Sequence, residues 1–230
     1  MSVRVETENL SKSFVLHLQG GLRLSVLRGV DLTARAGECV ALVGPSGAGK
    51  TTLLRSLYGN YRADSGAIRL RHDGDMLDLV TASPRQVVAA RARSIGYVSQ
   101  FLRVVPRVAA LDIVAEAARD VAPEAARAQA RALLLRLNIP QRLHGLPPAT
   151  FSGGEQQRVN LARGFIGAHP ILLLDEPTAS LDRANRDIVI AMIREAKAAG
   201  IAIIGIFHDT EVRGAVADRL HEVTILQDLA

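Results

Sequence analysis

The sequence predicts an α/β fold organised around a phosphate-binding loop, with an N-terminal antiparallel β layer and an inserted helical lobe. Residues 44–52 read Gly-Pro-Ser-Gly-Ala-Gly-Lys-Thr-Thr, which matches the pattern G-x-x-x-x-G-K-[ST] without a mismatch. Apolar runs of strand length at 170–174 and 201–207 are typical of a parallel sheet buried on both faces. Between 109 and 167 the apolar residues recur at helical spacing instead.

The phosphate loop is expected at a strand-to-helix junction, because anions bind to backbone N–H groups at a helix N-terminus. The mostly apolar run 38–43 supplies the strand, and 52–58 has the spacing of a helix. A glycine-rich turn with a solvated lysine is the alternative, and the flanking elements argue against it. Lys50 is expected to reach the β- and γ-phosphates, and Thr51 to hold Mg²⁺ through its hydroxyl. The candidate binding residues of the loop are Gly44, Ser46, Gly47, Ala48, Gly49, Lys50, Thr51 and Thr52.

Composition limits the partners. The 230 residues carry a net charge of +5, with a sequence pI near 10.0, which admits an anionic ligand or an acidic partner. Aromatic residues make up 3% and Trp is absent, so base-stacking platforms are scarce and no nucleic-acid partner is expected. The single cysteine, Cys39, rules out an intrachain disulfide and fits a cytoplasmic location. We see no secretion signal and no apolar run near the ~18 residues of a membrane helix, so any membrane would be crossed by another chain.

The N-terminal residues predict a small β layer. Runs 3–6 and 23–27 alternate like half-buried strands joined by a turn at Gly20-Gly21. After the loop helix, a turn at Asp64-Ser65-Gly66 leads into a strand at 67–71, and 77–80 continues the layer. Phe14 follows the first strand, where its ring could stack on an adenine or pack as an ordinary core residue. The sequence leaves these two readings open.

Polar side chains follow two predicted strands of the main sheet. The strand at 93–100 ends in Gln100, and the apolar strand at 170–176 ends in Asp175 and Glu176. In an open α/β sheet such positions face the ligand crevice. Gln100 could therefore contact Mg²⁺ and the attacking water, although a solvated loop glutamine is the simpler alternative. Asp175 is expected to hold Mg²⁺, usually through water, and Glu176 to orient or deprotonate the attacking water.

The C-terminal part supplies one more candidate. A helix is predicted at 183–199, closed by Gly200, and the strand at 201–207 ends in His208. A histidine at the crevice end of a strand parallel to the Asp175 strand can reach a γ-phosphate. A strand at 220–226 completes the predicted sheet.

The helical lobe contains a second candidate phosphate site. Helices are predicted at 110–118 and 124–138, and a third begins at Ser152, with Glu155 in capping-box position. Capping alone is one explanation. Gly153 and Gly154 are costly inside a helix but allow an anion to approach bare N–H groups, which favours phosphate binding at this helix start.

Together the motifs resemble the ATP-binding-cassette (ABC) ATPases over essentially the whole chain. They are the loop at 44–52, Gln100, the Ser152-Gly153-Gly154-Glu155 signature, the 172–176 strand, Ser180-Leu181-Asp182 and His208. The resemblance implies a single ABC nucleotide-binding domain at 1–230, with a RecA-like core and β layer at about 1–100 and 168–230 and a helical lobe at about 101–167. Phe151 and Glu155 replace the leucine and glutamine usual in the family's signature.

The family implies ATP and Mg²⁺ as ligands and a head-to-tail dimer, either a homodimer or a pair with a related ABC subunit. Each ATP would lie between the phosphate loop of one subunit and the Ser152–Glu155 signature of the other. Lys50, Glu176 and His208 would surround the γ-phosphate during hydrolysis, with Thr51, Gln100 and Asp175 around the metal.

Four stretches further resemble the PhnL family, the ABC subunits of the bacterial phosphonate carbon-phosphorus lyase system. They are residues 14–17, 98–104, 150–160 and 205–209. This resemblance implies ATP turnover in support of ribose-phosphonate triphosphate formation, with the lyase core complex as partner. An energy-coupling subunit of a membrane transporter is the alternative, with the surface at Gln100 and 101–103 receiving a cytoplasmic helix. A nucleotide-gated assembly or nucleic-acid clamp is a third reading, but the chain lacks the coiled-coil or zinc insertion of such proteins.

Overall fold

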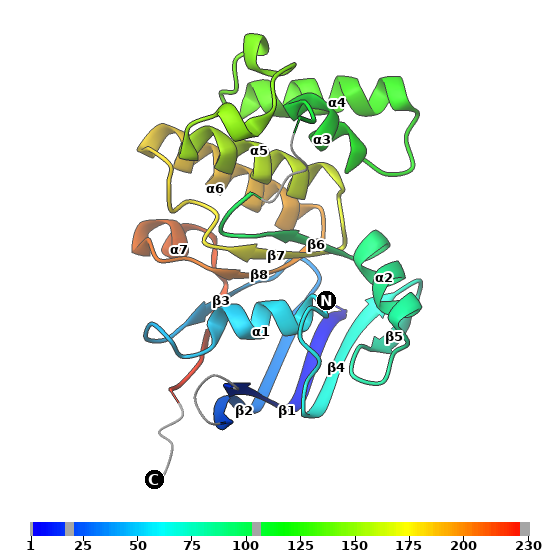
Figure 1. Cartoon of the computed structure of the whole chain (residues 1–230), viewed down its shortest axis with the longest axis vertical. Coiled ribbons are helices and arrows are strands. Elements are labelled where there is room, and N and C mark those ends of the chain that lie inside the picture. Colours follow the sequence, from blue (N-terminus) through cyan, green and yellow to red (C-terminus); the bar gives the residue numbers. More distant parts are fainter. Residues whose placement is uncertain (1, 17–20, 103–106, 226–230) are drawn as a thin grey trace.

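Two β-sheets and the helices that cover them make up the fold, in a computed structural model that describes residues 2–16, 21–102 and 107–225 (Figure 1). An antiparallel sheet has the strand order β2-β1-β4-β5, and a parallel sheet has the order β6-β7-β8-β3-β9. The β layer and the parallel sheet expected from the sequence are therefore both present.

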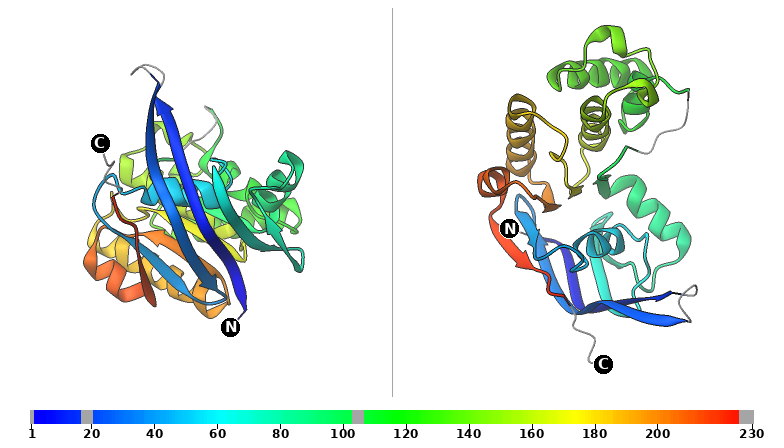
Figure 2. Two further views of the ribbon diagram at one scale, coloured as in Figure 1. Left: turned by 90° about the horizontal axis from the view of Figure 1, so that it is seen from below. Right: turned by 60° about the vertical axis from the view of Figure 1, so that its left-hand side comes forward.

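The antiparallel sheet is built on two long strands, which form a twisted pair in Figure 2 (left). Register shifts interrupt their pairing at four places. Because each shift breaks the period-two alternation, the sequence pattern revealed only parts of the two strands. Ser65 begins a strand here and is not part of a turn, and Gly20 of the expected hairpin turn lies outside the described residues. The strands are β1 (Val3–Leu16), β2 (Leu22–Arg35), β4 (Ser65–His72) and β5 (Asp75–Asp78).

The parallel sheet directs the carboxyl ends of its strands to one edge. Every residue of β7 and β8, two of its three interior strands, is buried, as their continuous apolar sequence predicts. Its last strand is shorter than expected, since it ends at Glu222, and Leu226 lies outside the described residues. The strands are β3 (Cys39–Val43), β6 (Ile95–Val98), β7 (Ile171–Asp175), β8 (Ala202–Ile206) and β9 (Arg219–Glu222).

The helices divide the apolar residues into two cores. Helix α1 lies between the two sheets (Figure 1), where Leu53 and Leu54 pack in one cluster with Leu10 of β1 and Ile204 of β8. The opposite face of the parallel sheet is covered by α5 and α6, and α3 and α4 pack outside α5 (Figure 2, right). The helices are α1 (Lys50–Leu57), α2 (Pro84–Arg93), α3 (Ala110–Glu116), α4 (Pro123–Arg136), α5 (Gly153–Ile166), α6 (Arg183–Ala198) and α7 (Thr210–Val216), with 3₁₀ turns at Gln141–Leu143 and Pro148–Thr150.

Helices α2 and α7 are not among the helices that the sequence predicts. Both are short, but each has a capping signal. Ser83 and Gln86 form a capping box at the start of α2, with Pro84 at the first helical position. Asp209 caps α7 by accepting hydrogen bonds from the backbone of Glu211 and Val212. Among the helices that the structure describes, none is long and apolar enough to span a bilayer.

Candidate nucleotide site

The phosphate loop joins β3 to α1, as expected, and its shape requires glycine at specific positions. At Gly44 (φ 137°) an added Cβ would lie 2.1 Å from the Val223 carbonyl oxygen, and at Gly49 (φ 95°) 2.9 Å from that of Val26. Lys50 is 9% exposed, and its Nζ donates to the carbonyl oxygens of Gly44 and Pro45, both at 2.8 Å. The lysine ammonium is therefore held inside the curve of the loop.

A pocket of about 400 Å³ opens beside this loop. It brings the loop together with three predicted residues from other parts of the chain, namely Phe14, Glu176 and His208. The signature residues at the start of α5 do not line it. The lining consists of Phe14, Val26, Ser46, Gly47, Gly49, Lys50, Thr51, Thr52, Glu176, Ile206 and His208.

A hydroxyl and a buried carboxylate meet next to the loop. Thr51 Oγ1 donates to Asp175 Oδ1 at 3.2 Å, and the hydroxyl of Tyr97 donates to Asp175 Oδ2 at 2.9 Å. Burial raises the pKa of the Asp175 carboxyl, while these two hydrogen bonds act in the opposite direction. Burial and the neighbouring Asp175 charge raise the pKa of the Tyr97 hydroxyl, which keeps its proton and donates.

This oxygen pair fits Mg²⁺. Mg²⁺ is typically held by one or two protein oxygens, with water and substrate phosphates completing the shell. Thr51 and Asp175 offer two such oxygens at the mouth of the loop. No group of three or more His, Cys, Asp or Glu suited to a metal occurs in the described part of the chain.

A second carboxylate, Glu176, lies beside the pocket and is held on both oxygens. Gln100 Nε2 donates to Glu176 Oε2 at 3.1 Å, and His208 Nε2 lies 2.8 Å from Oε1. The Glu176 backbone is left-handed (φ 52°), a conformation that non-glycine residues seldom adopt outside functional sites and turns. Three residues predicted from separate strand ends thus form one cluster.

The signature residues form the capping box that the sequence predicts. Ser152 Oγ accepts from the Glu155 backbone N–H at 3.4 Å, and Glu155 Oε2 accepts from the Ser152 N–H at 2.9 Å and its hydroxyl at 2.7 Å. The Ser152 hydroxyl bond is the main cause that lowers the pKa of Glu155. Ser152 and Gly153 are exposed.

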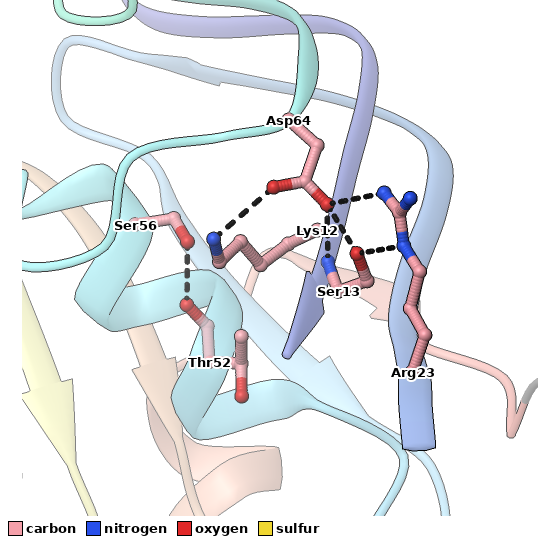
Figure 3. Close-up of polar contacts among 6 residues, drawn as sticks. All are labelled: Lys12, Ser13, Arg23, Thr52, Ser56 and Asp64. Atoms are coloured by element: carbon pink, nitrogen blue, oxygen red, sulfur yellow. Dashed lines mark hydrogen bonds and ion pairs between the residues drawn. The ribbon is translucent and has the colours of Figure 1, made fainter. Parts of the chain in front are cut away.

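Phe14 lines the pocket from β1, and a charged cluster fixes the strand around it (Figure 3). Its ring meets Tyr61 edge-on, with centroids 5.1 Å apart, and Lys12 Nζ lies 5.1 Å from the ring centre. Asp64 accepts from Lys12 at 3.2 Å and from the Ser13 backbone N–H at 2.7 Å, and also from the Ser13 hydroxyl. Arg23 lies 3.4 Å from the same carboxylate.

Sequence reasoning missed both Asp64 and Tyr97. The sequence predicts only a turn at Asp64, because its partners Lys12 and Ser13 stand 52 and 51 positions away. Tyr97 carries a usable signal, because it is the only side chain with a polar group in the strand Ile95–Val98.

A phosphate loop at a strand-helix junction, an adjoining hydroxyl-carboxylate pair and a second carboxylate held by an amide and an imidazole define a phosphate-loop nucleotide-binding domain. The family model described as ABC transporter matches residues 27–179, and the chain belongs to that family. The predicted fold and the broad ABC resemblance are thereby confirmed. ABC ATPase domains, the class to which the chain belongs, bind ATP with Mg²⁺.

Curated relatives align with nearly the whole chain. A LolD lipoprotein-releasing system ATP-binding protein of Maricaulis maris is 40% identical over 200 residues, which cover 86% of this chain and 85% of the relative. A MacB macrolide export ATP-binding/permease protein of Syntrophobacter fumaroxidans is 37% identical over 90% of this chain but only 29% of its own length. The chain spans 62% of an uncharacterised Mycobacterium tuberculosis ABC transporter ATP-binding protein, at 36% identity.

The fold also matches a solved structure. The dimeric post-hydrolysis ATP-binding cassette MJ0796, bound to ADP and Pi, superposes with a TM-score of 0.84 at 24% identity, covering 97% of both chains. The curated relatives above have transporter names and not names from the phosphonate system. They support the broad ABC resemblance and give the narrower PhnL resemblance no support.

Proposed function

We propose that the chain is the ATP-hydrolysing, energy-coupling subunit of a membrane transporter. The observation that carries this proposal is the 40% identity to a lipoprotein-releasing system ATP-binding protein, over 86% of this chain and 85% of that protein. The MacB relative, named as an ATP-binding/permease protein, supports it because the chain corresponds to only 29% of its length. In that relative an ATP-binding part and a permease part share one polypeptide.

The site residues have different roles in phosphoryl transfer. The loop N–H groups and Lys50 bind the β- and γ-phosphates of ATP and balance their charge. Bound Mg²⁺ supplies charge neutralisation between these phosphates, and Thr51, Asp175 and Gln100 are the residues that would hold it. Glu176 orients the attacking water and accepts its proton. His208 Nε2 lies 2.8 Å from the Glu176 carboxylate, and from there His208 would contact the γ-phosphate.

Two chains are needed for a complete site in this proposal. The first N–H groups of α5, at Gly153 and Gly154, have no acceptor within the helix, and this helix start does not line the chain's own pocket. A head-to-tail dimer, with a second copy or a related ABC subunit, would bring Ser152, Gly153, Gly154 and Glu155 to the γ-phosphate in the partner's loop. We further propose the domain division at about 101 and 167, with the helical lobe carrying this signature.

The catalytic assignment is tested with Glu176→Gln, which keeps the side-chain shape and removes the base. Hydrolysis is expected to fall by two orders of magnitude or more, on the order of a lost general base, while ATP-bound dimers accumulate in size-exclusion chromatography. Glu211→Gln removes one charge from an exposed position on α7 and is the matched control. Undiminished turnover in Glu176→Gln would show that another group activates the water.

The partner assignment is tested by purifying the native complex from detergent-solubilised cells. A transporter subunit should yield a chain with spans of ~20 apolar residues. The second candidate is the phosphonate carbon-phosphorus lyase system, which the four resembling stretches favour, although His17, Arg103 and Val104 of those stretches lie outside the described residues. Recovery of lyase subunits without a membrane chain would replace the transporter proposal by this one.

A further inference from the structure

The buried carboxylate of Asp175 has two hydroxyl partners, one on each oxygen. Thr51 Oγ1 donates to Oδ1 at 3.2 Å, and the Tyr97 hydroxyl donates to Oδ2 at 2.9 Å. We propose that Tyr97 is a positioning residue, which fixes the Asp175 carboxylate so that Oδ1 stays on the Thr51 side, where the metal of the substrate binds. This inference rests on the proposed roles of Thr51 and Asp175.

A carboxylate at a strand end needs such a partner to keep one orientation. The terminal torsion of aspartate is broad, so neither oxygen is fixed by the backbone alone. Asp175 is 2% exposed, and water cannot readily replace a missing donor there. With Oδ2 bound to Tyr97, Oδ1 stays next to Thr51, which lines the pocket. Residues that hydrogen-bond to a metal ligand on the side away from the metal commonly hold that ligand in one orientation.

Tyr97 is itself held from two other elements. Its ring stacks on Tyr58, with centroids 5.1 Å apart and 26° between the planes. Arg91 of α2 supports Tyr58, since its guanidinium lies 4.9 Å from that ring and donates to the Tyr58 carbonyl oxygen at 2.8 Å. The positive charge of Arg55 on α1 lies near enough to Tyr97 to act against the effect of burial on the pKa of its hydroxyl. The hydrogen bond of Arg55 goes to Tyr61, at 3.0 Å, so the Tyr97 hydroxyl is directed by Asp175 and its ring by Tyr58.

The arrangement links the metal side of the pocket to the helix that carries the phosphate loop. Thr51 donates to Asp175 from the first turn of α1, and Tyr58, at the end of the same helix, stacks on Tyr97. A shift of α1 relative to β7 would therefore disturb the partners of both oxygens of Asp175 together. This explains why a phenol is used in a strand that is otherwise apolar.

The test compares Tyr97→Phe with Tyr58→Phe in the full chain. Each variant keeps its ring and loses one hydroxyl, but the Tyr58 hydroxyl has no hydrogen-bond partner among the described residues. Mn²⁺ serves as the probe, and its binding to the protein-ADP complex is measured by electron paramagnetic resonance. Tyr97→Phe should weaken Mn²⁺ binding about 10-fold or more, as loss of such outer groups does, with metal-free ADP affinity unchanged. Tyr58→Phe should leave both affinities unchanged.

The variant Asp175→Asn separates the positioning role of Tyr97 from the metal-binding role of Asp175. If Asp175→Asn weakens Mn²⁺ binding but Tyr97→Phe does not, the positioning role of Tyr97 is overturned and the metal assignment stands. If neither variant changes Mn²⁺ binding, the metal assignment itself fails. Unchanged ADP affinity in Tyr97→Phe also shows that the variant is folded.

Discussion

Replacing Asp64 with Asn tests how the charged cluster at the end of β1 stabilises the fold. The substitution keeps the shape of the side chain but removes the charge that Lys12, Ser13 and Arg23 share. Hydrogen bonds from Ser13, followed by those from Lys12, lower the pKa of Asp64 from 3.8 to about 2. The charged form is therefore favoured in the folded state, and Asp64→Asn should destabilise the protein at neutral pH.

The size follows from the pKa difference between the folded and unfolded states. At 1.36 kcal/mol per unit, the lowering corresponds to roughly 2 kcal/mol. The side chain is 30% exposed, and screening by water reduces the contribution, so we expect a loss of about 1 kcal/mol in the free energy of unfolding. For a chain of this length, that loss lowers Tm by about 2–4 °C.

The assay is urea unfolding of both proteins as a function of pH. Because the folded pKa lies below the unfolded one, the stabilisation is fully present above pH ~4 and is lost as the pH falls towards ~2. The difference between wild type and Asp64→Asn should therefore shrink from pH 7 to pH 3. Glu8→Gln removes an exposed ion pair with Arg69 from the same sheet and should change little. An equal difference at pH 7 and pH 3 would refute the reasoning.

Two further predictions concern the sheet core and the pocket. Cys39 is 0% exposed and burial raises its pKa to about 12, so at pH 8 a maleimide should label it only after denaturant unfolds the chain; rapid labelling of the native protein would contradict this. Phe14→Ala should weaken ATP binding about 5-fold if its ring contacts the base, on the order of 1 kcal/mol for an aromatic contact, as measured by equilibrium titration with fluorescent ATP. Unchanged affinity would favour the alternative that Phe14 only packs against Tyr61.

The parallel sheet and its site were predictable because their signals are local. Continuous apolar runs identify β7 and β8, and a polar residue directly after each run marks the ligand edge. The rule that parallel strands end at one edge then predicts that Gln100, Glu176 and His208 gather, and their hydrogen bonds follow from that geometry. The antiparallel strands were harder to predict, because four register shifts interrupt their alternation.

The remaining contacts could not be predicted from sequence, because nothing local encodes their partners. The Tyr97–Asp175 bond joins residues 78 positions apart, and the Asp64–Ser13 bond joins residues 51 apart. A tyrosine in a strand predicts a pleated, half-buried position and not the atom that its hydroxyl contacts. Helix α2 is different, since Ser83, Pro84 and Gln86 form a readable start signal that periodicity alone did not reveal.

The signature helix poses an electrostatic problem for the proposed dimer. Glu155 stands where the family usually has glutamine, and its carboxylate accepts the Ser152 hydroxyl at 2.7 Å. A carboxylate near a partner's γ-phosphate would repel it, whereas a glutamine would not. Arg158 and Arg142 lie close enough to lower the pKa of Glu155, and they compensate part of its charge. In the proposed dimer, the N–H groups of Gly153 and Gly154 at the helix start are then the groups that attract the phosphate. The Ser152 hydroxyl must leave Glu155 before it can donate to ATP.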